Sequence, residues 1–301
     1  MSTRVITRFS QHPVMKQPGL KHLKERGKWA QQRAAEATWE QRVLPQVILA
    51  GVQRSGTTAL FEALYRLPNV ERPRRGKGSH YFSYNYYRGW EWFQSQFPTE
   101  AWAKRIEAKA GGPLFCFDAC PYYLFHPFAV ERMSLTLPDI KVMVMLRDPV
   151  RRAESHFHHS VSHGHEDLSF VDALDAEEER LAGEIDRMQQ DWSYWSHSHE
   201  HHSYFSKGLY VEQLERLFAN YDRDQVMVIQ SEEFYRNSNV VLAQATNWLG
   251  LPTVTVDQRD DRNGHAYEKM DQEMRQHLIE LYREPNEQLF ELLGQRYDWL
   301  N

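Results

Sequence analysis

The sequence predicts an α/β domain in which a mainly parallel sheet carries helices on both faces. Short apolar runs alternate along the chain with segments that have helical spacing. The runs at 47–49, 142–146 and 226–229 consist of Val, Ile, Leu and Met, as is typical of strands buried on both faces. A polar, glycine-containing turn also joins the first of these runs to a helical segment. Ligands of such sheets bind beyond the carboxyl ends of the strands, where we expect the site.

Residues 46–64 form the clearest strand–turn–helix unit. The strand covers 47–49, and the helix is indicated by apolar residues at helical spacing, namely Leu60, Ala63, Leu64 and Leu67. Gly51 and Gly56 bound the turn and let the backbone approach a ligand closely. The first N–H groups of the helix have no partners within the helix and point toward the turn. The turn is therefore predicted to bind an anion.

The spacing of Gly51 and Gly56 matches that of the nucleotide-binding P-loop. However, Thr57 stands where that loop has its lysine, and Arg54 is the only cation between the glycines. A lysine at that point would reach β- and γ-phosphates, so the loop suits a shorter phosphate chain. A strand–turn–helix with incidental glycines is the alternative interpretation of this loop taken alone.

A second unit runs from the strand 141–146 through Arg147 and Asp148 into a helix over Val150–Val161. Further strands are expected over Leu114–Asp118 and Gln225–Gln230, and another helix ends at Gly250. Asp118 is placed at the expected ligand edge of the sheet, either as a functional acid or as a capping or ion-paired residue.

Composition narrows the function classes. A chain of 301 residues with 41% apolar residues can bury a large core, and its net charge of -5 argues against a nucleic-acid binder. Cys116 and Cys120 are expected to be reduced core thiols. No apolar run of membrane-spanning length and no signal peptide is found, so a cytoplasmic protein is expected unless an N-terminal anchor has been removed. The oligomeric state is not predicted.

The chain divides into a basic N-terminal extension, residues 1–45, and a single domain, residues 46–301. The extension has nine Lys and Arg residues against three Glu. It is either a solvated, partly helical segment or a docking surface for an acidic acceptor or partner. Within the domain, Ser169–Met188 has the spacing of one surface helix.

Two groups of histidines follow the second unit. We expect no metal site, because consecutive histidines and histidines two apart do not share a helix face and no His-Glu-x-x-His motif is present. Solvated histidines beside an anionic cleft are the simpler interpretation. The residues are His156, His158, His159, His163 and His165, and then His197, His199, His201 and His202.

The segment Gln53–Leu60 closely resembles the 5′-phosphosulfate loop of sulfotransferases that use 3′-phosphoadenosine 5′-phosphosulfate (PAPS), especially the heparan-sulfate type and its bacterial relatives. Residues 141–157 resemble the 3′-phosphate segment of that family, with Ser155 eight residues beyond Arg147. Stretches 118–127, 207–216 and 284–293 are also similar to the family. The resemblance runs from about Val47 to the C-terminus and implies the same α/β architecture.

The resemblance implies PAPS as sulfuryl donor, no metal, and a hydroxyl-bearing or amine acceptor that is a glycan, a lipid or a small molecule. Arg54 would lie at the bridging oxygen, and Arg147 with Ser155 would hold the 3′-phosphate. The other residues implied to bind the donor are Ser55, Gly56, Thr57, Thr58 and Ala59 at the 5′ group, Tyr210, and the loop Arg262, Asn263, Gly264 and His265.

The catalytic base is less directly implied. The family has a Lys-Glu-x-His segment, whereas this chain has Lys77-Gly-Ser-His80, so Lys77 is retained and the glutamate is replaced by Gly78. If residues 78–82 are extended, positions 78 and 80 face the same way, which makes His80 the first candidate base. Asp118 and His159 are the next candidates. A histidine base predicts that turnover falls as the pH drops through roughly 6.5.

Two other functions remain open at this point. A P-loop kinase of a small metabolite would need a cation after Gly56, and Asp148 would have to supply its magnesium ligand. A catalytically inactive nucleotide- or glycan-binding relative is the second alternative, because the glutamate is missing.

Overall fold

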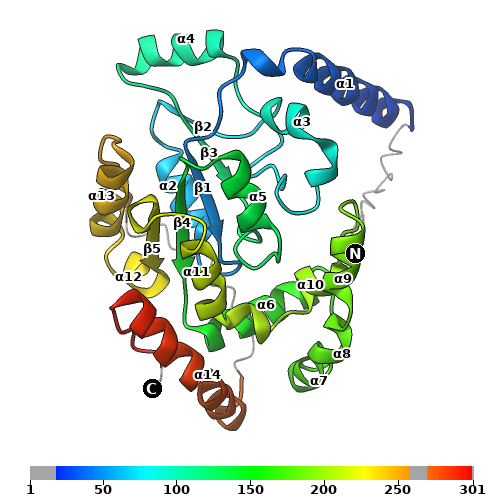
Figure 1. Ribbon diagram of the computed structural model, residues 1–301, viewed down its shortest axis with the longest axis vertical. Helices are drawn as coiled ribbons and strands as arrows, with labels where there is room; N and C mark the ends of the chain where they lie inside the picture. Colours follow the sequence, from blue (N-terminus) through cyan, green and yellow to red (C-terminus); the bar gives the residue numbers. More distant parts are fainter. Residues whose placement is uncertain (1–17, 258–269, 300–301) are drawn as a thin grey trace, which may run out of the picture.

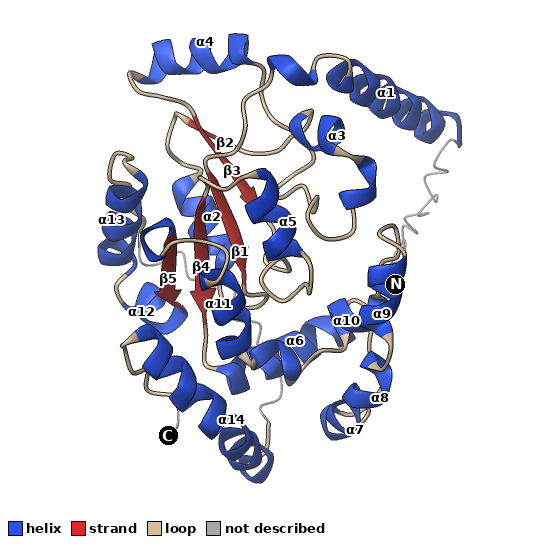
Figure 2. Ribbon diagram, viewed as in Figure 1, coloured by secondary structure: helices blue, strands red, loops and turns tan. Residues whose placement is uncertain are grey.

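The sheet of the protein is parallel and five-stranded, with the order β2-β3-β1-β4-β5. The computed structural model describes residues 18–257 and 270–299. The strands are β1 (Val47–Gly51), β2 (Val70–Glu71), β3 (Phe115–Ala119), β4 (Lys141–Leu146) and β5 (Val226–Gln230). Figure 2 shows these strands at the centre of the molecule with helices around them. The predicted fold class and the strand–turn–helix unit are confirmed.

Helices cover both faces of the sheet because alternate strand residues point to opposite sides. Val47 and Leu49 of β1 pack with α2 (Thr57–Leu64) and α13 (Ser238–Leu249). Ile48 and Ala50 face the other way, toward α5 (Ala129–Thr136), α11 (Tyr210–Phe218) and α14 (Gln272–Leu293). β1 is fully buried in the middle of the sheet, so the loop that follows it is held from both sides.

The remaining elements lie around this core (Figure 1). They are α1 (Pro18–Glu36), α3 (Trp90–Gln94), α4 (Glu100–Ala110), α6 (Pro149–Ser162), α7 (Phe170–Asp175), α8 (Glu177–Leu181), α9 (Glu184–Gln190), α10 (His197–His201) and α12 (Ser231–Arg236). Within residues 18–257 and 270–299, 3-10 helices cover Trp39–Gln41, Tyr86–Arg88, Ser206–Gly208 and Arg223–Gln225. The expected helix over Val150–Val161 is α6, extended by one residue at each end.

The single helix expected over Ser169–Met188 is wrong, since three short helices, α7 to α9, occupy this region. Ala182 takes an extended ψ of 122° and Gly183 a left-handed φ of 73°, and both values break the helix. The Glu177 carboxylate also accepts hydrogen bonds from the backbone N–H groups of Phe205 and Ser206, at 2.7 and 2.8 Å. Tertiary contacts therefore fold this segment back on the domain.

The end of α1 contacts the domain. Gln32 Nε2 donates to Ser95 Oγ at 2.9 Å, and Arg42 Nη1 donates to the Phe97 carbonyl at 2.7 Å. The boundary at residue 45 stays a prediction. Among the helices of the described residues, none combines the length and the hydropathy that crossing a membrane requires.

Candidate active site

The turn between β1 and α2 has a backbone that only certain residues tolerate. Arg54 has a φ of 72° and Gly56 a φ of 89°, both in the left-handed region. A Cβ atom at Gly56 would lie 2.7 Å from the hydroxyl of Tyr235, so this position needs glycine for space as well as for conformation. The N-terminus of α2, with its unpaired N–H groups, thus lies next to Tyr235.

A cavity of about 220 Å³ lies at this turn, beyond the carboxyl ends of β1 and β4. Arg54 Nε donates to Ser155 Oγ at 3.2 Å, although the two residues are 101 positions apart. Arg147 Nη1 donates to the Arg54 carbonyl at 3.0 Å. The loop between β1 and α2 and the segment from Arg147 to Ser155 therefore form one site. Its lining residues are Arg54, Gly56, Thr57, Thr58, Ala59, Arg147, Ser155 and Tyr235.

Lys77 brings another cation to the loop from a neighbouring segment. Its Nζ donates to Thr57 Oγ1 at 3.1 Å and to Thr58 Oγ1 at 3.2 Å. Burial lowers the pKa of Lys77 to about 8, so the ammonium is charged at neutral pH but is easily discharged. Ser55 is fully buried, and its Oγ has no hydrogen-bond partner within the described residues. The loop thus combines positive charge with a polar oxygen that other protein groups leave unused.

Residues 78–82 are not extended throughout, because the chain turns at His80 and continues as a turn from Tyr81, which corrects the geometry assumed for this segment. His80 has a φ of 53°, and its N–H donates to Cys120 Sγ at 3.0 Å. A Cβ at Gly78 would overlap the Ala119 carbonyl oxygen and Cys120 Sγ. The segment presses its backbone against the end of β3, so a glutamate does not fit at Gly78 in this conformation.

His80 lies beside Lys77 and is partly covered. Its ring stacks on Tyr84 with centroids 4.7 Å apart, and its Nδ1 is buried without a partner among the described residues. Burial, together with the Lys77 charge, lowers the pKa of His80 to about 4. The imidazole is therefore neutral at neutral pH, and its lowered pKa makes it a weaker base than an exposed histidine.

Asp118 anchors this segment from the end of β3. Its carboxylate accepts from the Ser79 N–H at 2.6 Å, from Ser79 Oγ at 2.7 Å and from the Tyr123 hydroxyl at 3.1 Å. The side chain is fully buried, and burial raises its pKa while these hydrogen bonds oppose the rise. Asp118 is not among the residues that line the cavity. Its contacts fix Ser79, and with it the neighbours Lys77 and His80.

Comparison with known proteins identifies the domain that carries this cavity. Residues 44–285 match the model of the sulfotransferase domain family. The chain belongs to this family. Its members transfer sulfuryl groups, and the chain is accordingly a sulfotransferase.

Two curated relatives show that the similarity is moderate. The membrane-associated sulfotransferase kil1 of Dictyostelium discoideum is 24% identical, with 86% of this chain and 67% of the relative aligned. Heparan sulfate glucosamine 3-O-sulfotransferase 3A1 of Mus musculus is 25% identical over 85% of this chain and 64% of the relative. The chain spans about two thirds of the length of these curated relatives. The cytoplasmic location stays a prediction.

A solved structure supports the same assignment. The sulfotransferase from Alicyclobacillus acidocaldarius superposes with a TM-score of 0.64 and is 27% identical, covering 86% of this chain and all (100%) of that chain. The α/β architecture of this sulfotransferase is thus also that of a solved relative.

Two further predicted residues have distinct surroundings. His159 lies one helical turn beyond Ser155 on α6, and burial, followed by the Arg54 charge, lowers its pKa to about 4. Tyr210 is buried, and its hydroxyl donates to the Arg147 carbonyl at 2.9 Å. In this sulfotransferase Tyr210 thus orients Arg147. The predicted loop Arg262, Asn263, Gly264 and His265 lies outside the described residues.

Two residues at the site were not singled out from the sequence. Tyr235 on α12 covers Gly56, and no sequence signal pointed to it. Lys207 is fully buried, and its Nζ donates at 2.6 Å both to Gln53 Oε1 in the loop and to the Glu200 carbonyl. Lys207 begins one of the stretches that resemble the family, which was the available signal. It ties the sulfotransferase loop to α10.

Proposed function

We propose that this sulfotransferase moves the sulfuryl group of PAPS to a hydroxyl or amine group of an acceptor. The observation that carries the proposal is the joint cavity, in which the β1–α2 loop and the pair Arg147 and Ser155 meet. A donor with anionic groups at both its 5′ and 3′ positions needs two such anion sites at a fixed separation. A nucleotide with one phosphate chain needs only the anion site at the β1–α2 loop.

The 5′ end of the donor fits the loop. The N–H groups at the start of α2 and the hydroxyls of Thr57 and Thr58 would hold the 5′-phosphate. The 3′-phosphate would contact Arg147 and Ser155. Charge-assisted hydrogen bonds to such groups are about twice as strong as neutral ones, which suits a doubly anionic ligand.

In the reaction, the bond between sulfur and the bridging oxygen of PAPS breaks while a bond from the acceptor oxygen to sulfur forms. Negative charge develops on the bridging oxygen, and adenosine 3′,5′-bisphosphate leaves. Arg54 and Lys77 would stabilise this charge, since both cations reach the loop. The protein mainly holds donor and acceptor in line, as in phosphoryl transfer.

The acceptor hydroxyl loses its proton to His80 in this proposal. His80 is supported by its neutral imidazole and its position beside Lys77, which contacts the same threonines as the donor would. Asp118 is a weaker candidate because three donors already occupy its carboxylate. Turnover by His80→Ala should fall by at least about 100-fold. Retention of turnover in His80→Ala with loss in His159→Ala would move the role to His159.

A carbohydrate is the proposed acceptor class. Two curated relatives are named as heparan sulfate sulfotransferases. The aromatic rings next to His80 support a sugar-binding surface, since Tyr84 contacts the exposed Trp195 with centroids 6.3 Å apart. Apolar sugar faces stack on such rings, while arginines pair with carboxylate or sulfate groups.

The proposal is tested by incubating the protein with sulfur-labelled PAPS and a panel of acceptors. The panel should contain desulfated and partly sulfated glycosaminoglycans, simple glycosides and phenols. We expect label to move to a glycan, and Arg54→Gly to slow the transfer by about 10²–10³. Label transfer from γ-labelled ATP with magnesium, but none from PAPS, would contradict the proposal and favour a kinase.

A further inference from the structure

Three histidines outside the proposed donor cavity lie together at the junction of α6 and α10. They are His165, from the loop after α6, and His197 and His201, at the two ends of α10. One ring nitrogen from each lies within 4.8 Å of the other two. His197 and His201 are four residues apart and so share a helix face. The junction lies where α10 is drawn beside α6 in Figure 1, and Ser160 of α6 contacts His201 of α10.

The spacing of these nitrogens fits a metal ion. His197 Nε2 and His165 Nδ1 are 3.2 Å apart. Two nitrogens that each lie 2.0–2.1 Å from a tetrahedral zinc ion are separated by about 3.3 Å. The His201 ring stacks on His165 with centroids 4.0 Å apart, and a ring nitrogen of His201 lies within 4.8 Å of the other two.

The backbone around these histidines is held in place by other contacts. Ser160 accepts the His165 N–H at 2.8 Å through its carbonyl and donates its hydroxyl to the His201 carbonyl at 3.0 Å. His202 Nε2 contacts the His165 carbonyl at 2.8 Å. The next residue, Glu166, is bound by Arg180 at 2.6 Å. A site whose supporting contacts already exist loses little conformational freedom on binding a ligand.

We propose that His165, His197 and His201 form a binding site for a divalent transition-metal ion of the zinc class. The site is separate from the sulfuryl-transfer chemistry and does not depend on the donor. Its ion would join the loop that follows α6, the helix that carries Ser155, to α10, whose Glu200 carbonyl accepts from Lys207. Binding would therefore stabilise the two segments that flank the donor loop.

Calorimetric titration of the protein, prepared without a histidine tag, with ZnCl₂ tests the site. We expect a binding event that His197→Ala and His201→Ala each weaken by at least about tenfold, since even the loss of a group that supports a ligand costs that much. His163→Ala and His277→Ala are the matched controls, because both side chains are exposed and neither belongs to the trio. Both controls should retain wild-type affinity.

Two further measurements guard against a trivial result. Circular dichroism should show that each variant is folded, and Co²⁺ should give the absorption spectrum of a tetrahedral nitrogen-ligated ion only in the wild type and the controls. Equal zinc affinity in the wild type, His197→Ala and His201→Ala would overturn the proposal, as would the absence of zinc binding to the folded wild type.

Discussion

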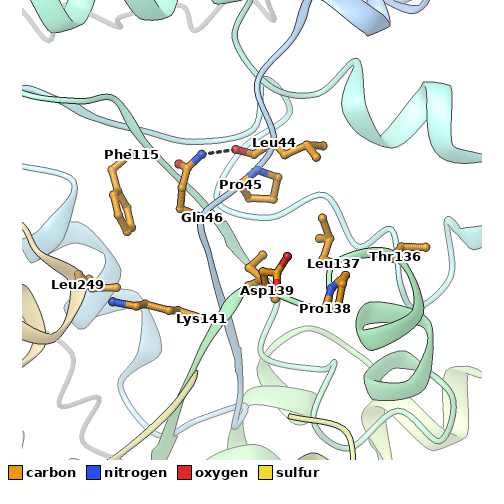
Figure 3. Close-up of a pocket in the computed structure, with 11 residues that line it drawn as sticks. Leu44, Pro45, Gln46, Phe115, Thr136, Leu137, Pro138, Asp139, Lys141 and Leu249 are labelled. Atoms are coloured by element: carbon orange, nitrogen blue, oxygen red, sulfur yellow. Dashed lines mark hydrogen bonds between the residues drawn. The ribbon is translucent and has the colours of Figure 1, made fainter. Parts of the chain in front are cut away.

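The two ends of the sheet offer two hollows of different size and character. The cavity at the carboxyl ends measures about 220 Å³, whereas the hollow at the amino ends measures about 450 Å³. Figure 3 shows the larger one, between the segment before β1 and the start of β4. Its lining is largely apolar or proline, with Leu44, Pro45, Phe115, Leu137, Pro138 and Leu249. The smaller cavity is lined by two arginines and three hydroxyl side chains besides Tyr235.

Structural contacts occupy three of the four polar side chains that line the amino-end hollow, those of Gln46, Thr136 and Lys141, whereas the fourth, Asp139, is exposed. Gln46 donates to the Leu44 carbonyl at 2.6 Å and accepts the Cys116 N–H at 2.7 Å. Lys141 donates to the Trp248 carbonyl and lies over the Trp248 ring. At the carboxyl end, by contrast, Ser55 Oγ is buried without a partner in the described part of the chain. The carboxyl-end cavity is therefore distinguished by a buried polar group without a protein partner in the described residues, and not by a larger volume.

Replacement of Arg54 should have the largest effect. Arg54→Gly removes the cation while glycine accepts the φ of 72° without strain. We expect kcat to fall by about 10²–10³, as for loss of one group that stabilises developing charge. Asp139→Asn, in the amino-end hollow, is the control and should leave kcat unchanged. Equal activity of both variants would contradict the assignment of the active site to the carboxyl end of the sheet.

Arg147→Ala should weaken binding of adenosine 3′,5′-bisphosphate by about 1.5–3 kcal/mol, or roughly 10- to 150-fold. Binding of the analogue without the 3′-phosphate should change little, and Ser155→Ala should show the same bias more weakly. Calorimetric titration measures both ligands. Equal losses for the two nucleotides would mean that Arg147 acts only by supporting the Arg54 carbonyl.

Asp118→Asn should destabilise the fold by about 1–3 kcal/mol, because an amide cannot accept all the donors that the carboxylate satisfies. Asp139→Asn, exposed at the opposite end, should change the free energy of unfolding by less than about 0.5 kcal/mol. Urea unfolding measures both. A stable Asp118→Asn that lacks turnover would instead make this carboxylate part of the chemistry.

The smallest expected effect is that of pH, because activity should change little over the physiological range. His80 must be neutral to act as a base, so kcat/KM falls only as the pH drops toward about 4 and His80 is protonated. Lys77 must be charged, so activity falls again above about 8. A loss centred near 6.5, as expected for an unperturbed histidine, would show that a more exposed group controls the reaction.

The sequence predicted the parts of the site that depend on local pattern. The turn after β1 and the segment from Arg147 to Ser155 each follow a buried strand, and parallel strands bring such segments to one edge. The hydrogen bond between Arg54 and Ser155 is a finding of the structure that the sequence did not specify. The turn between β1 and α2 was thus predictable because its glycines and the helix N-terminus are encoded within a few residues.

The rest depends on contacts between distant segments. The conformation of Lys77–His80 is set by Asp118 and Cys120, which no local spacing reveals. The histidine trio also escaped prediction, since α10 has only five residues and its borders decide that His197 and His201 share a face. The spacing of residues 169–188 favoured one helix. The left-handed Gly183 and the contacts of Glu177 with a distant segment divide it, and neither can be predicted from local spacing.

Thermal denaturation with saturating nucleotides tests the central claim most directly. Adenosine 3′,5′-bisphosphate should stabilise the wild type by about 2.7 kcal/mol at a hundredfold excess over its dissociation constant. Under the same conditions Arg147→Ala should gain much less, and ATP with magnesium should have little effect on the wild type. Stabilisation by ATP with magnesium and none by adenosine 3′,5′-bisphosphate would contradict the account of a cavity built for a donor with both 5′ and 3′ anionic groups.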